Sequence, residues 1–121
     1  MEEILQMFGG ADNVLPTIKS SANRLGRATT KMMLHLFYVM KSPQTSVVNK
    51  SIIIAALAYQ LLPKDVLSVK KFGLLGLLDN AVTLTLAYNR VKSSVTPEIE
   101  KATEDKLNTW FSETETSHDR E

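Results

Sequence analysis

Two carboxylates and an amide are the residues of this chain whose types could do chemistry together. Asp65 follows a proline at the end of one apolar segment, and Asp79 and Asn80 are adjacent inside a second apolar run. Carboxylate and amide oxygens are the ligands that hard divalent cations prefer, so these three side chains are the candidates for a cation site. An ionised carboxylate in apolar surroundings must be paired, capped or functional, because burying it alone costs too much free energy.

A structural role explains the two acids better than a cation site does. If a helix begins at Gly76, then Asp79 lies in its first turn, where a carboxylate accepts from free backbone amides and faces the positive end of the helix dipole. Asp65 suits the same role after Pro63. Three oxygen side chains with no further carboxylate make a poor cage for a cation. We therefore expect capping acids and no bound metal, and a cation-dependent enzyme is the minor hypothesis.

No other catalytic or cofactor-binding motif is recognisable. His35 stands alone and His118 lies in the polar C-terminal stretch, so no zinc-binding constellation exists. The absence of cysteine excludes disulfides and thiolate chemistry. Gly73 and Gly76 lack the spacing of a nucleotide-binding loop. The sequence predicts a protein that is not an enzyme, with no cofactor and no identifiable small-molecule substrate.

Length and charge set the class of protein. The chain has 121 residues, 44% of them hydrophobic and 22% charged, which is enough for one domain with its own core. The net charge of +1 gives no signature of nucleic-acid binding. Residues 1–71 hold nine Lys/Arg against four Asp/Glu, whereas residues 72–121 hold five against nine. This charge polarity could steer docking or self-association, or the charged residues could simply form a solvated surface. The acidic N-terminal residues with their short apolar run predict no secretory signal.

Helical periodicity runs from about residue 12 to residue 112, and no strand is expected. A short opening helix over residues 2–8 would end at Gly9-Gly10. An amphipathic segment over about 16–41 follows, with Asn13 as its candidate cap, and Gly26 is the point at which this segment could become two helices. Ser42-Pro43 then predicts the cap and first turn of the next helix.

The two most apolar segments, 46–62 and 74–92, are expected at the centre of the fold, with Pro63 ending the first. A last helix opens at Thr96-Pro97-Glu98. Its packing stripe comprises Ile99, Thr103, Leu107, Trp110 and Phe111. We expect an all-α, single-domain helical bundle of four or five helices over 1–112, built on a central apolar helical hairpin, with a disordered polar tail over 113–121.

Motifs at the apolar corner are shared with a known family. The residues that carry the likeness are Tyr59, Pro63, Asp65, Gly76, Asp79 and Asn80. In this spacing they resemble the YkvA-like bacterial domain of unknown function, over roughly residues 30–112. The chain departs from the family where Leu67-Ser68-Val69 replaces Ile-Pro-Asp and where Asn80 replaces the second acid of an Asp-Asp pair. Relatives are usually described as helical and often as membrane-associated, so the resemblance implies a fold and a location and no activity.

Whether the apolar hairpin lies in a membrane or in the protein core stays open from the sequence. Residues 52–62 span about 16 Å as a helix, against a hydrocarbon core of about 30 Å. Residues 72–89 are nearly long enough to span, but Asp79 near their middle would cost about 2.5–3.5 kcal/mol. The residues favour a soluble bundle, whereas the resemblance favours membrane association as a shallow hairpin with flanking lysines at the headgroups.

A basic stripe is the candidate contact with an anionic surface. Arg24, Arg27 and Lys31 have the spacing of neighbours on one helix face, and Lys70 and Lys71 form a second basic pair. Such a stripe is usually a solvated face, but beside an apolar hairpin it suits anionic lipid. We expect a non-catalytic helical module on the cytoplasmic side of a membrane. The alternative is a soluble cytoplasmic domain that forms homo-oligomers or binds a protein partner.

Overall fold

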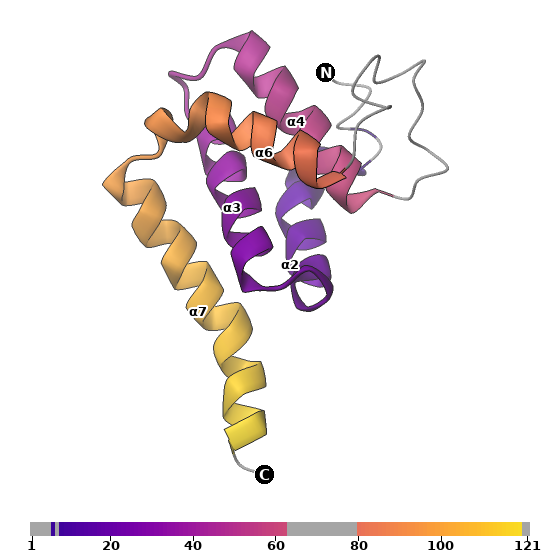
Figure 1. Ribbon diagram of the computed structural model, residues 1–121, viewed down its shortest axis with the longest axis vertical. Helices are drawn as coiled ribbons and strands as arrows, with labels where there is room; N and C mark the ends of the chain where they lie inside the picture. The colour runs from indigo at the N-terminus through magenta and orange to yellow at the C-terminus, as the bar shows by residue number, and fades with distance from the viewer. Residues whose placement is uncertain (1–5, 7, 63–79, 120–121) are drawn as a thin grey trace.

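The structure is a computed structural model that describes residue 6 and residues 8–62 and 80–119 of the chain. Within these residues it is an all-α bundle with five α-helices, two short 3-10 helices and no strand, which confirms the predicted fold class (Figure 1). In chain order the elements are η1 (Ala11–Asn13), α2 (Val14–Leu25), α3 (Arg27–Lys41), α4 (Val47–Leu61), α6 (Asn80–Val91), η4 (Lys92–Ser94) and α7 (Pro97–Asp119).

The amphipathic segment is divided into α2 and α3 at Gly26, the point at which the sequence allowed a break. Gly26 has a φ of +88°, in the left-handed region that residues with a Cβ rarely adopt. Its N–H donates to the carbonyl oxygen of Ala22 and so closes the last turn of α2. Asn13 precedes α2 as predicted, but its side chain donates to the Gly9 carbonyl oxygen (3.0 Å) and caps no helix amide. The two helices consequently lie side by side (Figure 1).

The predicted start of the next helix at Ser42-Pro43 is wrong. The chain forms a turn over residues 42–46, and α4 begins at Val47 with Ser46 as its N-cap. The Ser46 hydroxyl accepts from the Asn49 N–H (3.1 Å), which is the usual geometry of a serine cap. The turn is held by Thr45, whose hydroxyl donates to a carbonyl oxygen in the last turn of α3 (2.6 Å). This bond keeps the chain out of helical conformation until residue 47.

α3 lies at the centre of the bundle, and α2, α4, α6 and α7 all pack against it (Figure 1). Five consecutive residues, Met33–Phe37, are buried. Because consecutive residues of a helix point in directions about 100° apart, a run of this length means that the helix is covered on every side. The centre of the fold therefore includes a third helix beside the two apolar segments that the sequence placed there.

The two apolar segments fold back on each other, as the sequence predicted. α4 ends at Leu61, directly before the Leu62-Pro63 pair, and α6 packs along it. Arg90 in the last turn of α6 donates from Nε to Oδ1 of Asn49 in the first turn of α4 (2.6 Å). The end of α6 thus lies beside the start of α4, and the two helices run antiparallel.

α7 begins as the sequence predicted. The Thr96 hydroxyl accepts from the Ile99 N–H (3.2 Å), and Glu98 is an acid in the first turn. Thr103 and Leu107 are buried, and the rest of the predicted stripe packs against the core. The helix continues to Asp119 and projects past the bundle, although we expected a disordered tail from residue 113 (Figure 1). The sequence has no glycine or proline after Pro97 that would end it.

Replacing Leu107 with alanine should strongly destabilise the fold. Leu107 is fully buried where α7 packs on α3, and removing a buried leucine side chain typically costs about 2–5 kcal/mol. Leu86→Ala is the matched control: Leu86 is 54% exposed on α6, so we expect a loss below about 1 kcal/mol. Urea unfolding followed by circular dichroism measures both. Equal losses in the two variants would show that α7 does not dock on the bundle as described.

Candidate functional site

Most residues of the predicted acidic motif lie outside the described part of the chain. Pro63, Asp65, Gly76 and Asp79 are in the segment 63–79, as are Lys70 and Lys71. Tyr59 is half-buried on α4, and Asn80 is the first residue of α6. Among the described residues, no three His, Asp or Glu side chains come together as metal ligands. The capping roles of the two acids and their minor alternative, a cation site, therefore stay predictions.

The predicted basic stripe is largely used inside the protein. Arg27 and Lys31 on α3 both pair with Glu104 on α7, at 3.4 Å and 3.3 Å between the charged atoms. Arg27 also donates to Oδ1 of Asn108 (2.9 Å). Arg24, at the end of α2, is exposed and is the one member of the stripe without a partner among the described residues. The stripe therefore helps to join α3 to α7, and it does not present three free cations to a ligand.

Exposed aliphatic side chains gather on the α4–α6 pair. Among the described residues, the large hydrophobic side chains that are exposed are Val47, Val48, Val82 and Leu86, which we call the outer α4–α6 surface. Val82, Leu86 and Arg90 recur every four residues and so follow one line along α6. Because Arg90 binds Asn49, this line ends at the first turn of α4, where the two other valines are exposed. The four side chains thus belong to adjoining parts of the molecule.

The inner side of the same hairpin is covered by the chain's own helices. Ile53–Ala58 on α4 are buried, as are Leu84 and Ala87 on α6. Leu74 and Leu77, which belong to the predicted apolar segment, lie outside the described residues. Within the described ranges, no helix has both the length and the apolar character needed to cross a bilayer. The buried side chains Ile53–Ala58 of α4 belong to the hydrophobic core of the protein.

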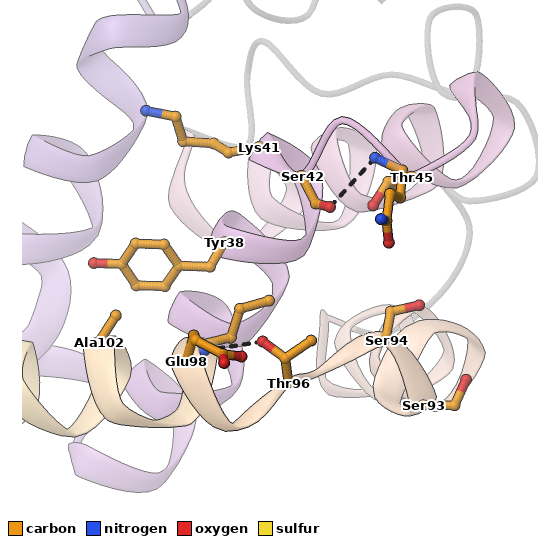
Figure 2. Close-up of a pocket in the computed structure, with 11 residues that line it drawn as sticks. Tyr38, Lys41, Ser42, Thr45, Ser93, Ser94, Thr96, Glu98 and Ala102 are labelled. Carbon is orange, nitrogen blue, oxygen red and sulfur yellow. Dashed lines mark hydrogen bonds between the residues drawn. The ribbon is translucent and has the colours of Figure 1, made fainter.

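A pocket of about 630 Å³ opens at one end of the bundle (Figure 2). It lies between the end of α3, the 42–46 turn, η4 and the first turns of α7. The residues that line it are Tyr38, Lys41, Ser42, Gln44, Thr45, Ser93, Ser94, Thr96, Glu98, Ile99 and Ala102. Lys41 and Glu98 carry opposite charges, and most of the other lining side chains carry hydroxyl or amide groups. No sequence motif predicts this pocket, because its walls come from segments that are distant along the chain.

A buried histidine lies where α3, α6 and α7 meet. His35 is 3% exposed and its ring stacks on Tyr88 of α6, with ring centres 5.9 Å apart. The Tyr88 hydroxyl lies 3.4 Å from Nδ1. Nε2 has no hydrogen-bond partner among the described residues, and the same is true of the buried hydroxyls of Thr30 and Thr103. We therefore see a core histidine with one weak polar contact, and its surroundings favour the neutral ring.

Burial lowers the pKa of His35, and the surrounding charges modify this effect. The carboxylates of Glu100 and Glu104 raise the pKa, and the ammonium of Lys31 lowers it, but desolvation is the largest cause. The folded protein therefore resists protonation of this ring at a pH at which the unfolded chain would accept the proton.

The comparisons with known proteins give no family for this chain: no family model, curated protein or solved structure matches it. The resemblance to the YkvA-like domain accordingly remains a prediction from the motif residues.

Acidification should destabilise the protein through His35. With a folded-state pKa below the ordinary value of 6.5, the unfolded state binds more protons between the two values, so stability is fully present above 6.5 and falls as pH falls toward the folded pKa. For one such group the slope is at most about 1.4 kcal/mol per pH unit. Nuclear magnetic resonance titration of the ring protons should give His35 a pKa below the ordinary histidine value of 6.5. A His35 pKa equal to or above 6.5 would contradict this assignment.

Proposed function

We propose that this chain is a non-catalytic helical module that binds an anionic membrane surface through the outer α4–α6 surface. The observation that carries the proposal is that the exposed large aliphatic side chains of the described residues all lie on α4 and α6. Such side chains are exposed in a folded protein at a cost, and their gathering on two adjoining helices is typical of a surface that contacts a membrane or a partner.

Basic side chains at this surface favour the membrane. Arg90 continues the line of Val82 and Leu86, Lys92 follows α6 directly, and Lys50 lies in the first turns of α4. A basic residue close to an anionic leaflet contributes about 1 kcal/mol to binding. The cytoplasmic leaflet is the anionic one, so the proposal places the protein on the cytoplasmic side. The resemblance to a family whose members are often membrane-associated supports the same location.

The size of the surface favours reversible binding. Complete burial of a valine or leucine side chain is worth about 1.5–3 kcal/mol, and about half of each of these four is available. Together they supply roughly 3–6 kcal/mol, which is enough for peripheral contact when three basic residues assist. An arrangement of this kind lies in the interface between headgroups and acyl chains, with its apolar side chains inserted to a shallow depth.

Because of the ion pairs of α3, the basic residues that we expect to contact the membrane differ from the predicted basic stripe. Arg27 and Lys31 are paired with Glu104, so their charge is already partly compensated. Arg24 has no partner among the described residues. Lys50 and Lys92 replace the paired residues as the expected contacts beside the apolar surface. Lys70 and Lys71 lie outside the described residues and keep their predicted role.

Removing two of the aliphatic side chains should weaken vesicle binding. We expect the protein to float with vesicles that contain phosphatidylglycerol, and Val82→Ser with Leu86→Ser to weaken this binding by about tenfold or more, because the loss of two apolar contacts exceeds about 1.4 kcal/mol. Thr85→Ser, a change at an exposed position on the same helix, is the matched control and should bind as the native chain does.

Salt and charge give the second part of this test. Lys50→Gln with Lys92→Gln should weaken binding to phosphatidylglycerol vesicles and reduce its dependence on salt, since screening acts on those charges. Binding that is unchanged by the serine substitutions contradicts the proposal. If the serine substitutions instead abolish a dimer in solution and no variant binds vesicles, the surface is a self-association site and the alternative function holds.

A further inference from the structure

The polar contacts between α3 and α7 fix how these two helices align (Figure 1). Lys31 of α3 pairs with Glu104 of α7, at 3.3 Å between the charged atoms. Arg27, one turn earlier on α3, donates to Asn108, one turn later on α7 (2.9 Å). Residue numbers thus rise along one helix as they fall along the other, so the two helices run antiparallel.

One turn further along this contact, a histidine and a carboxylate lie opposite each other. His35 follows Lys31 by four residues and Glu100 precedes Glu104 by four, so the alignment of the helices places His35 beside Glu100. Glu100 is exposed, and the ion pairs found among the described residues do not involve it. Its carboxylate is therefore available to pair with a protonated imidazole ring.

The neutral ring of His35 is held by α6. It is 3% exposed and stacks on Tyr88, with ring centres 5.9 Å apart. Nε2 has no hydrogen-bond partner among the described residues. Protonation would place an N–H donor and a positive charge on this buried ring, and a buried charged donor without an acceptor is costly. The protonated ring therefore gains by moving to a carboxylate.

The charged and titratable groups around the ring come from three helices. Besides desolvation, which lowers the pKa of the ring most, Glu100 and Glu104 of α7 raise this pKa and Lys31 of α3 lowers it. The facing group of α6 is the phenol of Tyr88. Among the described residues, α2 and α4 place no charge that acts on the ring. Glu104 already pairs with two cations, so Glu100 is the carboxylate that can accept a hydrogen bond from the ring.

We propose that His35 is a pH-dependent switch between two helices: the neutral ring packs on Tyr88 of α6, and the protonated ring turns to Glu100 of α7. The proton comes from solvent, and the N–H bond is the only covalent bond that forms. In the neutral position the ring joins α3 to α6. In the protonated position it adds a further ion pair between α3 and α7. Acid therefore loosens α6 while α7 stays docked.

The switch acts on the helix that carries half of the outer α4–α6 surface. Val82 and Leu86 are exposed on α6, so a change in how firmly α6 is held changes how this surface is presented. The inference nevertheless concerns the chain in solution. It goes beyond the proposed function, because the ring would move whether or not the chain touches a membrane.

Nuclear magnetic resonance of the full chain, at neutral pH and below the titration midpoint of His35, tests the inference. We expect ring-to-ring Overhauser contacts between His35 and Tyr88 at neutral pH, and contacts between the His35 ring and the Glu100 side chain in acid. Amide exchange, corrected for the intrinsic rate at each pH, should show that α6 loses about two- to tenfold of its protection in acid. This is the effect expected for one stacked aromatic pair. The α7 amides that face α3 should keep their protection.

Three variants separate the switch from general acid sensitivity. Glu100→Gln removes the carboxylate, so His35 should titrate at lower pH and the loosening of α6 should move to lower pH with it. Glu98→Gln is the matched control, because Glu98 is an exposed acid of the same helix that does not act on the ring. This variant should titrate as the native chain does. His35→Phe keeps an aromatic ring against Tyr88 and cannot take up a proton, so the protection of α6 should no longer depend on pH.

Three results would overturn the inference. The first is contact between the rings of His35 and Tyr88 that persists below the His35 midpoint. The second is a Glu100→Gln variant in which His35 titrates as in the native chain. The third is unfolding of the whole native chain before the ring takes up its proton. If His35→Phe does not fold, Glu100→Gln still decides, because it changes an exposed side chain.

Discussion

The apolar character of α4 is the constraint on which the rest of the fold depends. This helix carries aliphatic side chains on nearly every side between Ile52 and Leu61. One neighbouring helix can cover only one side of it, so α3 and α6 both pack against it. Because Met33–Phe37 of α3 are all buried, α3 must in turn be covered, and α2 and α7 pack against it. The other helices of the bundle are therefore arranged around α4 and α3.

The same constraint explains why α6 has two different faces. Its inner side, with Leu84, Ala87 and Val91, is used to cover α4, whereas Val82 and Leu86 are exposed. No further described helix lies over them to bury them. The exposed aliphatic face of α6 therefore takes no part in the packing of the described helices, and it is the part of α6 that we propose to contact a membrane.

Part of the charge polarity of the chain is compensated by ion pairs within the fold. Arg27 and Lys31 from the basic half meet Glu104 from the acidic half, across the contact between α3 and α7. All three side chains are more than 40% exposed, so these pairs add at most about 1 kcal/mol each, and the burial of Leu107 contributes more to the docking of α7. The ion pairs orient α7, and the apolar stripe holds it.

Local rules predicted most of the helix ends, and contacts between distant segments explain the rest. Gly26 and Thr96-Pro97 are strong signals of one residue or two, and each marks a helix boundary as expected. α4 likewise ends at Leu61, close to the position at which the sequence predicted its end. Ser42 and Ser46 are both suitable caps, but Ser42 ends α3 and Thr45 bonds back to that helix, so Ser46 caps α4. The pairing of Arg27 with a residue 77 positions away, and the pocket walls from α3, η4 and α7, leave no local signal in a single sequence.

Amide hydrogen exchange is the measurement that tests the central claim, that α3 and α4 form a core covered by the other helices. The account predicts that the amides of Met33–Phe37 and Ile53–Leu57 exchange only through global unfolding, with the same free energy as urea unfolding gives. The amides of the first turn of α4 and of the outer face of α6 should exchange faster through local opening. Exchange of the Met33–Phe37 amides that is as fast as that of the α2 amides would contradict the claim.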